Sequence, residues 1–187
     1  RYLNSFWTFL QKEGLTKDNP VARIESLRIE STIKKAFSVQ ELEALRMACV
    51  RPRDRALIEF LYATGVRVSE LCSLNVGDID LYKQEFKVMG KGRKERHLYI
   101  SDGACFHLFR YLRWRMNREG LTMEELANKP LFVSAKKPYS RMTVAGVQYL
   151  VKSLGKKAGV GNVHPHRFRR TFATDLLNRG MRIEEVM

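Results

Sequence analysis

The chain has 187 residues, 44% of them hydrophobic, and its 34 lysines and arginines outnumber 20 acidic residues to give a formal charge of +14. This length allows one well-buried core with part of a second unit, and no apolar run approaches the roughly 20 residues that a membrane-spanning helix needs. So large a positive charge favours a polyanionic partner, nucleic acid being the commonest, over a generally basic soluble protein.

Residues 1–19 begin with a predicted helix whose apolar side chains Leu3, Phe6, Trp7 and Leu10 follow helical spacing, with no capping residue ahead of them. We expect this helix to be the end of a truncated unit. Residues 20–37 are polar and basic and follow a helix-breaking Asn-Pro pair, which predicts a linker. The main domain is then predicted over residues 38–187.

The main domain opens with a capping box, Ser38 and Glu41, ahead of an apolar stripe. A second helix is predicted to turn Leu57, Phe60 and Leu61 inward and to end at Gly65, a residue suited to a left-handed cap. The string "RVSELCSL" predicts a short third helix directly after it.

The periodicity then changes. Residues 78–90 and 95–101 predict two strands joined by a hairpin, and residues 130–135 predict a third strand. Longer helices are predicted over 102–120, 143–159 and from 165 to near Gly180, the first of them turning Phe106, Phe109, Leu112 and Met116 to the core. The predicted fold class is mainly α with a small three-stranded antiparallel sheet.

Three cysteines, Cys49, Cys72 and Cys105, are widely spaced among apolar neighbours. No C-x-x-C pair joins them, so they indicate buried thiols in a reducing cytoplasm rather than disulfides or a metal cluster. A cytoplasmic protein is therefore expected.

The stretch "HPHRFRRTFAT", residues 164–174, concentrates charge at the start of a predicted helix. His166 and Arg169 fall on one face, and Arg167 and Arg170 fall on another. A helix N-terminus carrying a histidine and an arginine is a natural seat for phosphate. The alternatives are a solvated basic face and a metal site, the latter disfavoured because no cysteine or carboxylate stands at ligand spacing from the histidines.

Two further basic residues stand at unusual places. Arg67, in "ATGVRVSEL", lies between apolar helices, where a guanidinium is costly to desolvate without a ligand; the alternative is a core arginine paired with Glu70. Lys91 lies between two glycines in "MGKGRKER", which let a backbone approach a ligand closely. That string lacks the spacing of a nucleotide-binding loop, and its plain alternative is a basic turn.

Together, "ATGVRVSELCSL", "GKGRKER" and "HPHRFRRTFAT" resemble the catalytic domain of the tyrosine recombinases, the family of phage and transposon integrases and Xer recombinases. The likeness covers Ser38 to the end, and residues 1–19 resemble the last helix of that family's SAM-like core-binding domain. By position, the resemblance implies catalytic roles for Arg67, Lys91, His166 and Arg169. It also implies that further basic residues contact the DNA backbone, the candidates being Arg93, Lys94, Arg96, Arg141, Arg167 and Arg170.

The resemblance implies site-specific cleavage and rejoining of double-stranded DNA through a 3′-phosphotyrosine, without metal or other cofactor. Family members assemble as tetramers on paired sites, and a monomer is expected without DNA. The chain stops at Met187, before the family's second active-site histidine and its nucleophilic tyrosine, so we expect the chain alone not to cleave DNA. Arg170 stands where the family often has histidine, which leaves its role open. A catalytically inactive DNA-binding regulator and a type IB topoisomerase-like enzyme are the alternatives.

Overall fold

The computed structural model describes residues 2–24, 35–89 and 95–182. The chain divides into two units, Arg1–Lys34 and Lys35–Met187. The first contains α1 (Tyr2–Lys12), none of whose residues is buried. None of the helices in the described ranges is long and apolar enough to cross a lipid bilayer. The predicted boundaries at residues 19 and 37 stay predictions.

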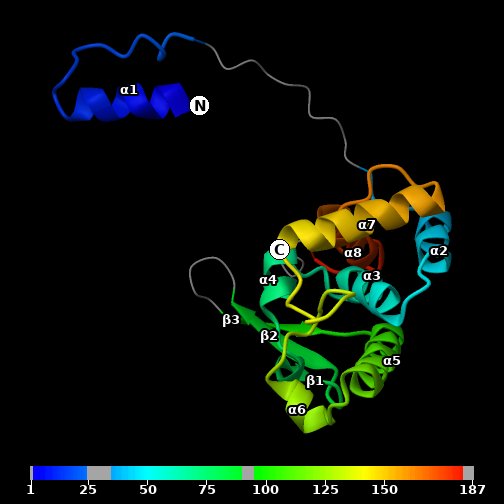
Figure 1. The fold of residues 1–187 in the computed structure, drawn as a ribbon. Helices are drawn as coiled ribbons and strands as arrows, with labels where there is room; N and C mark the ends of the chain where they lie inside the picture. Colours follow the sequence, from blue (N-terminus) through cyan, green and yellow to red (C-terminus); the bar gives the residue numbers. More distant parts are fainter. Residues whose placement is uncertain (1, 25–34, 90–94, 183–187) are drawn as a thin grey trace. The chain divides into compact units, whose positions relative to one another are not determined.

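The second unit is mostly helical with one small sheet, which confirms the predicted fold class (Figure 1). Its elements in order are α2 (Val39–Met47), α3 (Pro52–Thr64), α4 (Val68–Ser73), a 3₁₀ turn (Val76–Asp78), β1 (Ile79–Asp80), β2 (Glu85–Met89), β3 (Glu95–Tyr99), α5 (Asp102–Glu119), α6 (Met123–Ala127), α7 (Val144–Ala158) and α8 (Pro165–Asn178).

Local capping chemistry sets the ends of these helices as predicted. The Ser38 hydroxyl accepts the Glu41 N–H at 3.1 Å, and the Glu41 carboxylate accepts the Ser38 N–H at 2.9 Å, so α2 begins with a complete capping box. The helix α3 ends at Gly65, whose φ of 56° lies in the left-handed region that glycine adopts readily.

The helix α3 forms the centre of the second unit, with α5 and α8 packed against it (Figure 1). Leu57, Phe60 and Leu61 are at most 1% exposed, which confirms their predicted inward direction. Their burial removes apolar surface from water and anchors the elements that surround α3. The site described below lies at the C-terminal end of this helix.

The sheet has the order β1-β2-β3 with both pairs antiparallel. The predicted strand at 130–135 is wrong, because that segment forms only isolated bridges, although Phe132 is buried. The third strand is instead β1, which the sequence predicts as one strand with β2 over residues 78–90. The Asp80 carboxylate accepts the N–H groups of Tyr82 and Lys83, and this local turn separates the two strands.

The helix α5 also differs from its prediction. Phe106 and Phe109 are 58% and 47% exposed, whereas Leu112 is buried as expected. Arg115 takes an interior place, donating to Glu119 at 2.6 Å and to the Pro130 carbonyl at 2.7 Å. Because carbonyls from a distant segment satisfy this guanidinium, α5 presents a face to the core that hydrophobic spacing alone did not indicate.

Candidate functional site

Arg67 is the N-cap residue of α4, two residues after α3 ends at Gly65. Its backbone N–H donates to Glu70 Oε2 at 2.9 Å, and its Nη1 donates to Glu70 Oε1 at 2.9 Å. The side chain nevertheless stays 41% exposed. Arg67 therefore pairs with Glu70, as the alternative interpretation predicted, but it is not a core residue. Its guanidinium remains accessible to a ligand.

Glu70 joins two arginines from different elements. Its side chain is 9% exposed, and its Oε2 also accepts Nη2 of Arg96, from β3, at 2.7 Å. A buried carboxylate needs such partners because desolvation otherwise disfavours its charged form. The pairing of Glu70 with Arg96 was missed from the sequence, since no local pattern relates residues on α4 and β3.

Arg169, on α8, completes this cluster of charges. It is half-buried, and its Nη1 donates to the backbone carbonyl of Gly65. Burial and the nearby positive charges of Arg67 and Arg96 lower the pKa of Arg169, while Glu70 acts in the opposite direction. The structure thus brings three guanidiniums together around one carboxylate, a local excess of positive charge that suits an anion.

The start of α8 lies as the sequence predicted. His164 is the N-cap and Pro165 takes the first helical position. His166 is exposed, and its ring centroid lies 6.4 Å from that of His164. Within residues 2–24, 35–89 and 95–182, no group of three or more His, Cys, Asp or Glu side chains is arranged to hold a metal ion.

Arg167 requires a correction, because it is 8% exposed and its donors are engaged inside the second unit. It donates to the Glu41 carboxylate at 2.7 Å, to the Gly161 carbonyl at 2.7 Å and to the Ala36 carbonyl at 3.1 Å. Its guanidinium carbon also lies 4.1 Å from the ring centroid of Phe37. A guanidinium held in this way connects α8 to the segment before α2. Its donors are therefore already engaged, and the expectation that Arg167 contacts DNA is corrected.

Arg141 and Arg170, two of the other basic residues expected to contact DNA, lie within the described part of the chain. Arg141 is exposed, and its Nη1 donates to the carbonyls of Cys72, Ser73 and Leu74, each at 2.9 Å, where it caps the C-terminal end of α4. Arg170 is half-exposed and donates to the Lys35 carbonyl at 3.2 Å. Lys91, Arg93 and Lys94 lie outside the described residues.

Tyrosines of the second unit occupy varied surroundings. Tyr99 and Tyr149 are 69% and 77% exposed. The Tyr62 hydroxyl donates to Asp175 at 2.7 Å, and burial together with that contact raises the pKa of Tyr62. A phenol whose pKa is raised is a poorer nucleophile at neutral pH, and we assign none of these three side chains to chemistry.

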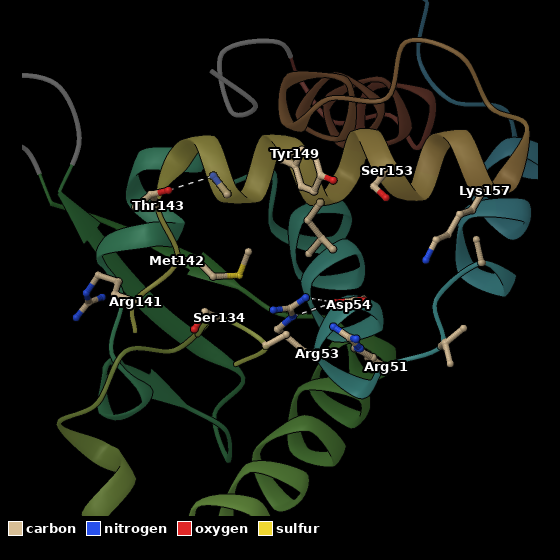
Figure 2. A pocket seen from close by; sticks show the side chains of 15 residues that line it. Arg51, Arg53, Asp54, Ser134, Arg141, Met142, Thr143, Tyr149, Ser153 and Lys157 are labelled. Atoms are coloured by element: carbon tan, nitrogen blue, oxygen red, sulfur yellow. Dashed lines mark hydrogen bonds and ion pairs between the residues drawn. The ribbon is translucent and has the colours of Figure 1, made fainter. Parts of the chain in front are cut away.

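A separate open cavity of about 690 Å³ lies beside the N-terminal end of α3. Figure 2 shows Tyr149, Ser153 and Lys157 of α7 on one side of it, facing Arg51, the N-cap residue of α3, and Arg53 in its first turn. Neither Arg67, His166 nor Arg169 lines it. The cavity and the arginine cluster therefore belong to opposite ends of α3.

Related proteins are found by comparison of both the sequence and the fold. Residues 22–187 match the sequence profile of the phage integrase family. The tyrosine recombinase XerC of Bacillus licheniformis is 37% identical over 190 residues, which are 98% of this chain and 62% of that protein. The XerC of Bacillus subtilis is 36% identical, with the same coverage. The chain thus spans about three fifths of these relatives' length.

Two solved structures share the fold. The crystal structure of the XerA recombinase has a TM-score of 0.71 and 30% identity, covering 87% of this chain and 56% of that one. The Tn1549 transposon integrase in complex with circular intermediate DNA has a TM-score of 0.73 and 24% identity, covering 97% of this chain and 65% of that one.

Proposed function

This chain belongs to the phage integrase family, and on that premise we propose that its whole protein is a site-specific DNA recombinase that cleaves and rejoins strands through a 3′-phosphotyrosine intermediate. The observation that supports the proposal is the hydrogen bond from Arg169, on α8, to the Gly65 carbonyl at the end of α3, two residues before Arg67. We place the nucleophilic tyrosine beyond residue 187, and the chain alone is expected to bind DNA weakly without cleaving it.

The two arginines suit the charge that develops during cleavage. When a phenol oxygen attacks a phosphodiester, negative charge grows on the two non-bridging oxygens. Planar guanidiniums bind such oxygens through paired, charge-assisted hydrogen bonds and stabilise the transition state. Arg67 is exposed enough to reach a ligand. The hydrogen bond to the Gly65 carbonyl holds the Arg169 side chain at the chain segment that carries Arg67.

The proposed reaction balances without an external energy source. The tyrosine oxygen forms a bond to phosphorus while the bond from phosphorus to the 5′-oxygen breaks. Lys91 is proposed to give its proton to the leaving 5′-oxygen, and His166 to hydrogen-bond the phosphate or help deprotonate the phenol. The covalent intermediate keeps the bond energy for rejoining, and side-chain cations supply the positive charge, so the scheme uses no metal or nucleotide.

Double-stranded DNA is the proposed partner. The net charge of +14 favours binding to a polyanion, and the related Tn1549 integrase was solved with DNA. Arg93, Lys94, Arg141 and Arg170 remain proposed contacts to the DNA backbone, whereas Arg96 is treated separately below. We propose a monomer without DNA, a tetramer on paired sites and a cytoplasmic location.

Covalent attachment to nicked DNA tests this proposal. The full-length protein is first used to select the duplex that it binds from a genomic pool. A nick near the cleavage point lets the short 5′-hydroxyl fragment leave, so that the covalent complex accumulates and survives denaturing electrophoresis. A 3′-phosphotyrosine adduct on the selected site supports the recombinase. Specific binding without an adduct would indicate an inactive regulator, and adducts without site preference would indicate a topoisomerase.

A further inference from the structure

Arg96 is a mostly buried cation with one hydrogen bond to a carboxylate and one buried nitrogen that has no partner among the described residues. Its Nη2 donates to Glu70 at 2.7 Å, and its side chain is only 27% exposed. Its Nε is buried and has no hydrogen-bond partner among the described residues. Buried donors seldom lack a partner, and the contact with Glu70 is the hydrogen bond that this guanidinium makes to the described residues. Arg96 is therefore held by Glu70 and directed away from open solvent.

The Glu70 carboxylate is divided between two arginines. Oε1 accepts Nη1 of Arg67, while Oε2 accepts Nη2 of Arg96 and the backbone N–H of Arg67. A guanidinium facing a free carboxylate prefers to bind both oxygens side by side, which occupies two of its nitrogens. With Arg96 and the backbone N–H of Arg67 both on Oε2, one side-chain nitrogen of Arg67, Nη1, donates to Glu70 in the structure.

We propose that Arg96 is a positioning residue, which shares the Glu70 carboxylate with Arg67 and thereby keeps the remaining Arg67 donors directed at a bound phosphate. The proposal rests on the function proposed above for Arg67. It replaces the expectation that Arg96 contacts the DNA backbone directly. Without Arg96, the Arg67 guanidinium is free to turn onto both oxygens of Glu70 and to withdraw donors from the phosphate.

The surroundings of Arg169 fit the same assignment. The positive charge of Arg96 acts on Arg169 as well as that of Arg67 does. Arg96 thus belongs to the same cluster of charges as Arg67 and Arg169. Its loss is expected to weaken anion binding through the position of Arg67.

Binding of tungstate, a tetrahedral dianion, to the 187-residue chain tests this proposal without requiring cleavage. Isothermal titration compares the unaltered chain with Arg96→Gln, Arg67→Ala and the double variant. Lys87→Gln is the matched control, because Lys87 is an exposed cation of the same sheet, paired with exposed Glu95 at 3.1 Å, and its loss changes the charge equally. Thermal melting verifies that each variant is folded.

We expect Arg67→Ala and Arg96→Gln each to weaken tungstate binding about tenfold, the size of one charge-assisted hydrogen bond, and Lys87→Gln to weaken it less than about twofold. In the Arg67→Ala background, Arg96→Gln should produce no further loss, since it acts through Arg67. Arg96→Lys should restore most of the affinity, because an ammonium can still donate to Oε2.

Two results overturn the positioning role. If the losses in affinity multiply in the double variant, Arg96 contacts the anion itself. If Arg96→Gln weakens binding no more than Lys87→Gln does, Arg96 contributes only its positive charge and does not position Arg67. An unchanged affinity in Arg67→Ala would instead refute the phosphate site on which the proposed function depends, so the two failures are distinguishable.

Discussion

The backbone carbonyl of Gly65 accepts a hydrogen bond from Nη1 of Arg169, and this contact joins the end of α3 to the face of α8 that carries His166. Gly65 has a φ of 56°, and a Cβ at this position would lie 2.4 Å from Cδ1 of Phe172. The close approach of α8 to α3, which brings Arg169 near Arg67, therefore depends on the absence of a side chain at residue 65.

Gly65→Ala is expected to destabilise the protein more than Gly120→Ala. Both glycines have positive φ, but an added Cβ at Gly120 meets nothing within 4 Å. The left-handed backbone costs alanine about 1–2 kcal/mol at either site, and overpacking against Phe172 adds about 1–3 kcal/mol at Gly65 only. Melting temperatures of the two variants measure the difference, and equal shifts would contradict the close packing of α8 on α3.

Arg167→Ala is expected to reduce stability by about 2–4 kcal/mol, because it leaves the carbonyls of Ala36 and Gly161 and the Glu41 carboxylate without their donor. Arg170→Ala removes the same charge from a half-exposed neighbour with one hydrogen bond of 3.2 Å, and about 0.5–1 kcal/mol is expected. Urea unfolding measures both values. Similar losses in the two variants would contradict the interior role assigned to Arg167.

Glu41 is expected to make stability depend on acid pH. Burial raises its pKa, but the hydrogen bond from the Ser38 N–H and the contacts with Arg167 outweigh it, so the net pKa lies below the ordinary 4.5. A carboxyl with a lowered folded pKa stabilises the protein above its unfolded pKa, and that contribution is lost as pH falls through the folded value.

The free energy of unfolding should therefore fall below about pH 4.5, and Glu41→Gln should make this fall shallower while lowering stability at pH 7. Glu124→Gln, at an exposed position of α6, serves as the charge-matched control. Unfolding curves at several pH values provide the measurement. An unchanged slope in Glu41→Gln would show that its ion pair with Arg167 contributes nothing to folding.

Cys49 is expected to be the slowest thiol to react with iodoacetamide. Burial, aided by the charge of Asp54, raises its pKa to about 12, while burial raises the pKa of Cys72 and Cys105 to a smaller extent. Because the thiolate is the reactive form, little of Cys49 is reactive at pH 8 in the native protein. Peptide mass spectrometry gives the order of labelling, and early labelling of Cys49 would contradict its burial.

Local signals in the sequence predicted much of the fold. The capping box at Ser38, the glycine cap at Gly65 and the proline at the start of α8 each act within one turn of chain, so the residues alone indicate them. The order of three motifs then indicated Arg67 and Arg169 by resemblance. Periodicity could not have placed those two side chains together, since α3 and α8 meet only in the folded chain.

Some of the differences from the sequence prediction have one physical origin, which is the burial of polar groups by distant partners. The sequence predicts Arg167 as a DNA contact and gives no signal for Arg115, yet carbonyls from other segments satisfy both inside the protein. The Glu70–Arg96 contact likewise joins α4 to β3. The sheet differs for a local reason, because the Asp80 turn lies within a run of strand-forming residues that predicts a single strand where β1 and β2 form.

Covalent attachment of the full-length protein to a nicked duplex, with Arg169→Ala compared with Arg170→Ala, tests the central claim most directly. If Arg169 stabilises the transition state, its loss should reduce the rate of adduct formation about 100-fold or more, whereas Arg170→Ala should retain most of the rate. A gel shift measures how much DNA affinity each variant loses, and rates taken at saturating protein concentration separate chemistry from affinity. An unchanged rate in Arg169→Ala would contradict the assignment of the arginine cluster as the site of cleavage.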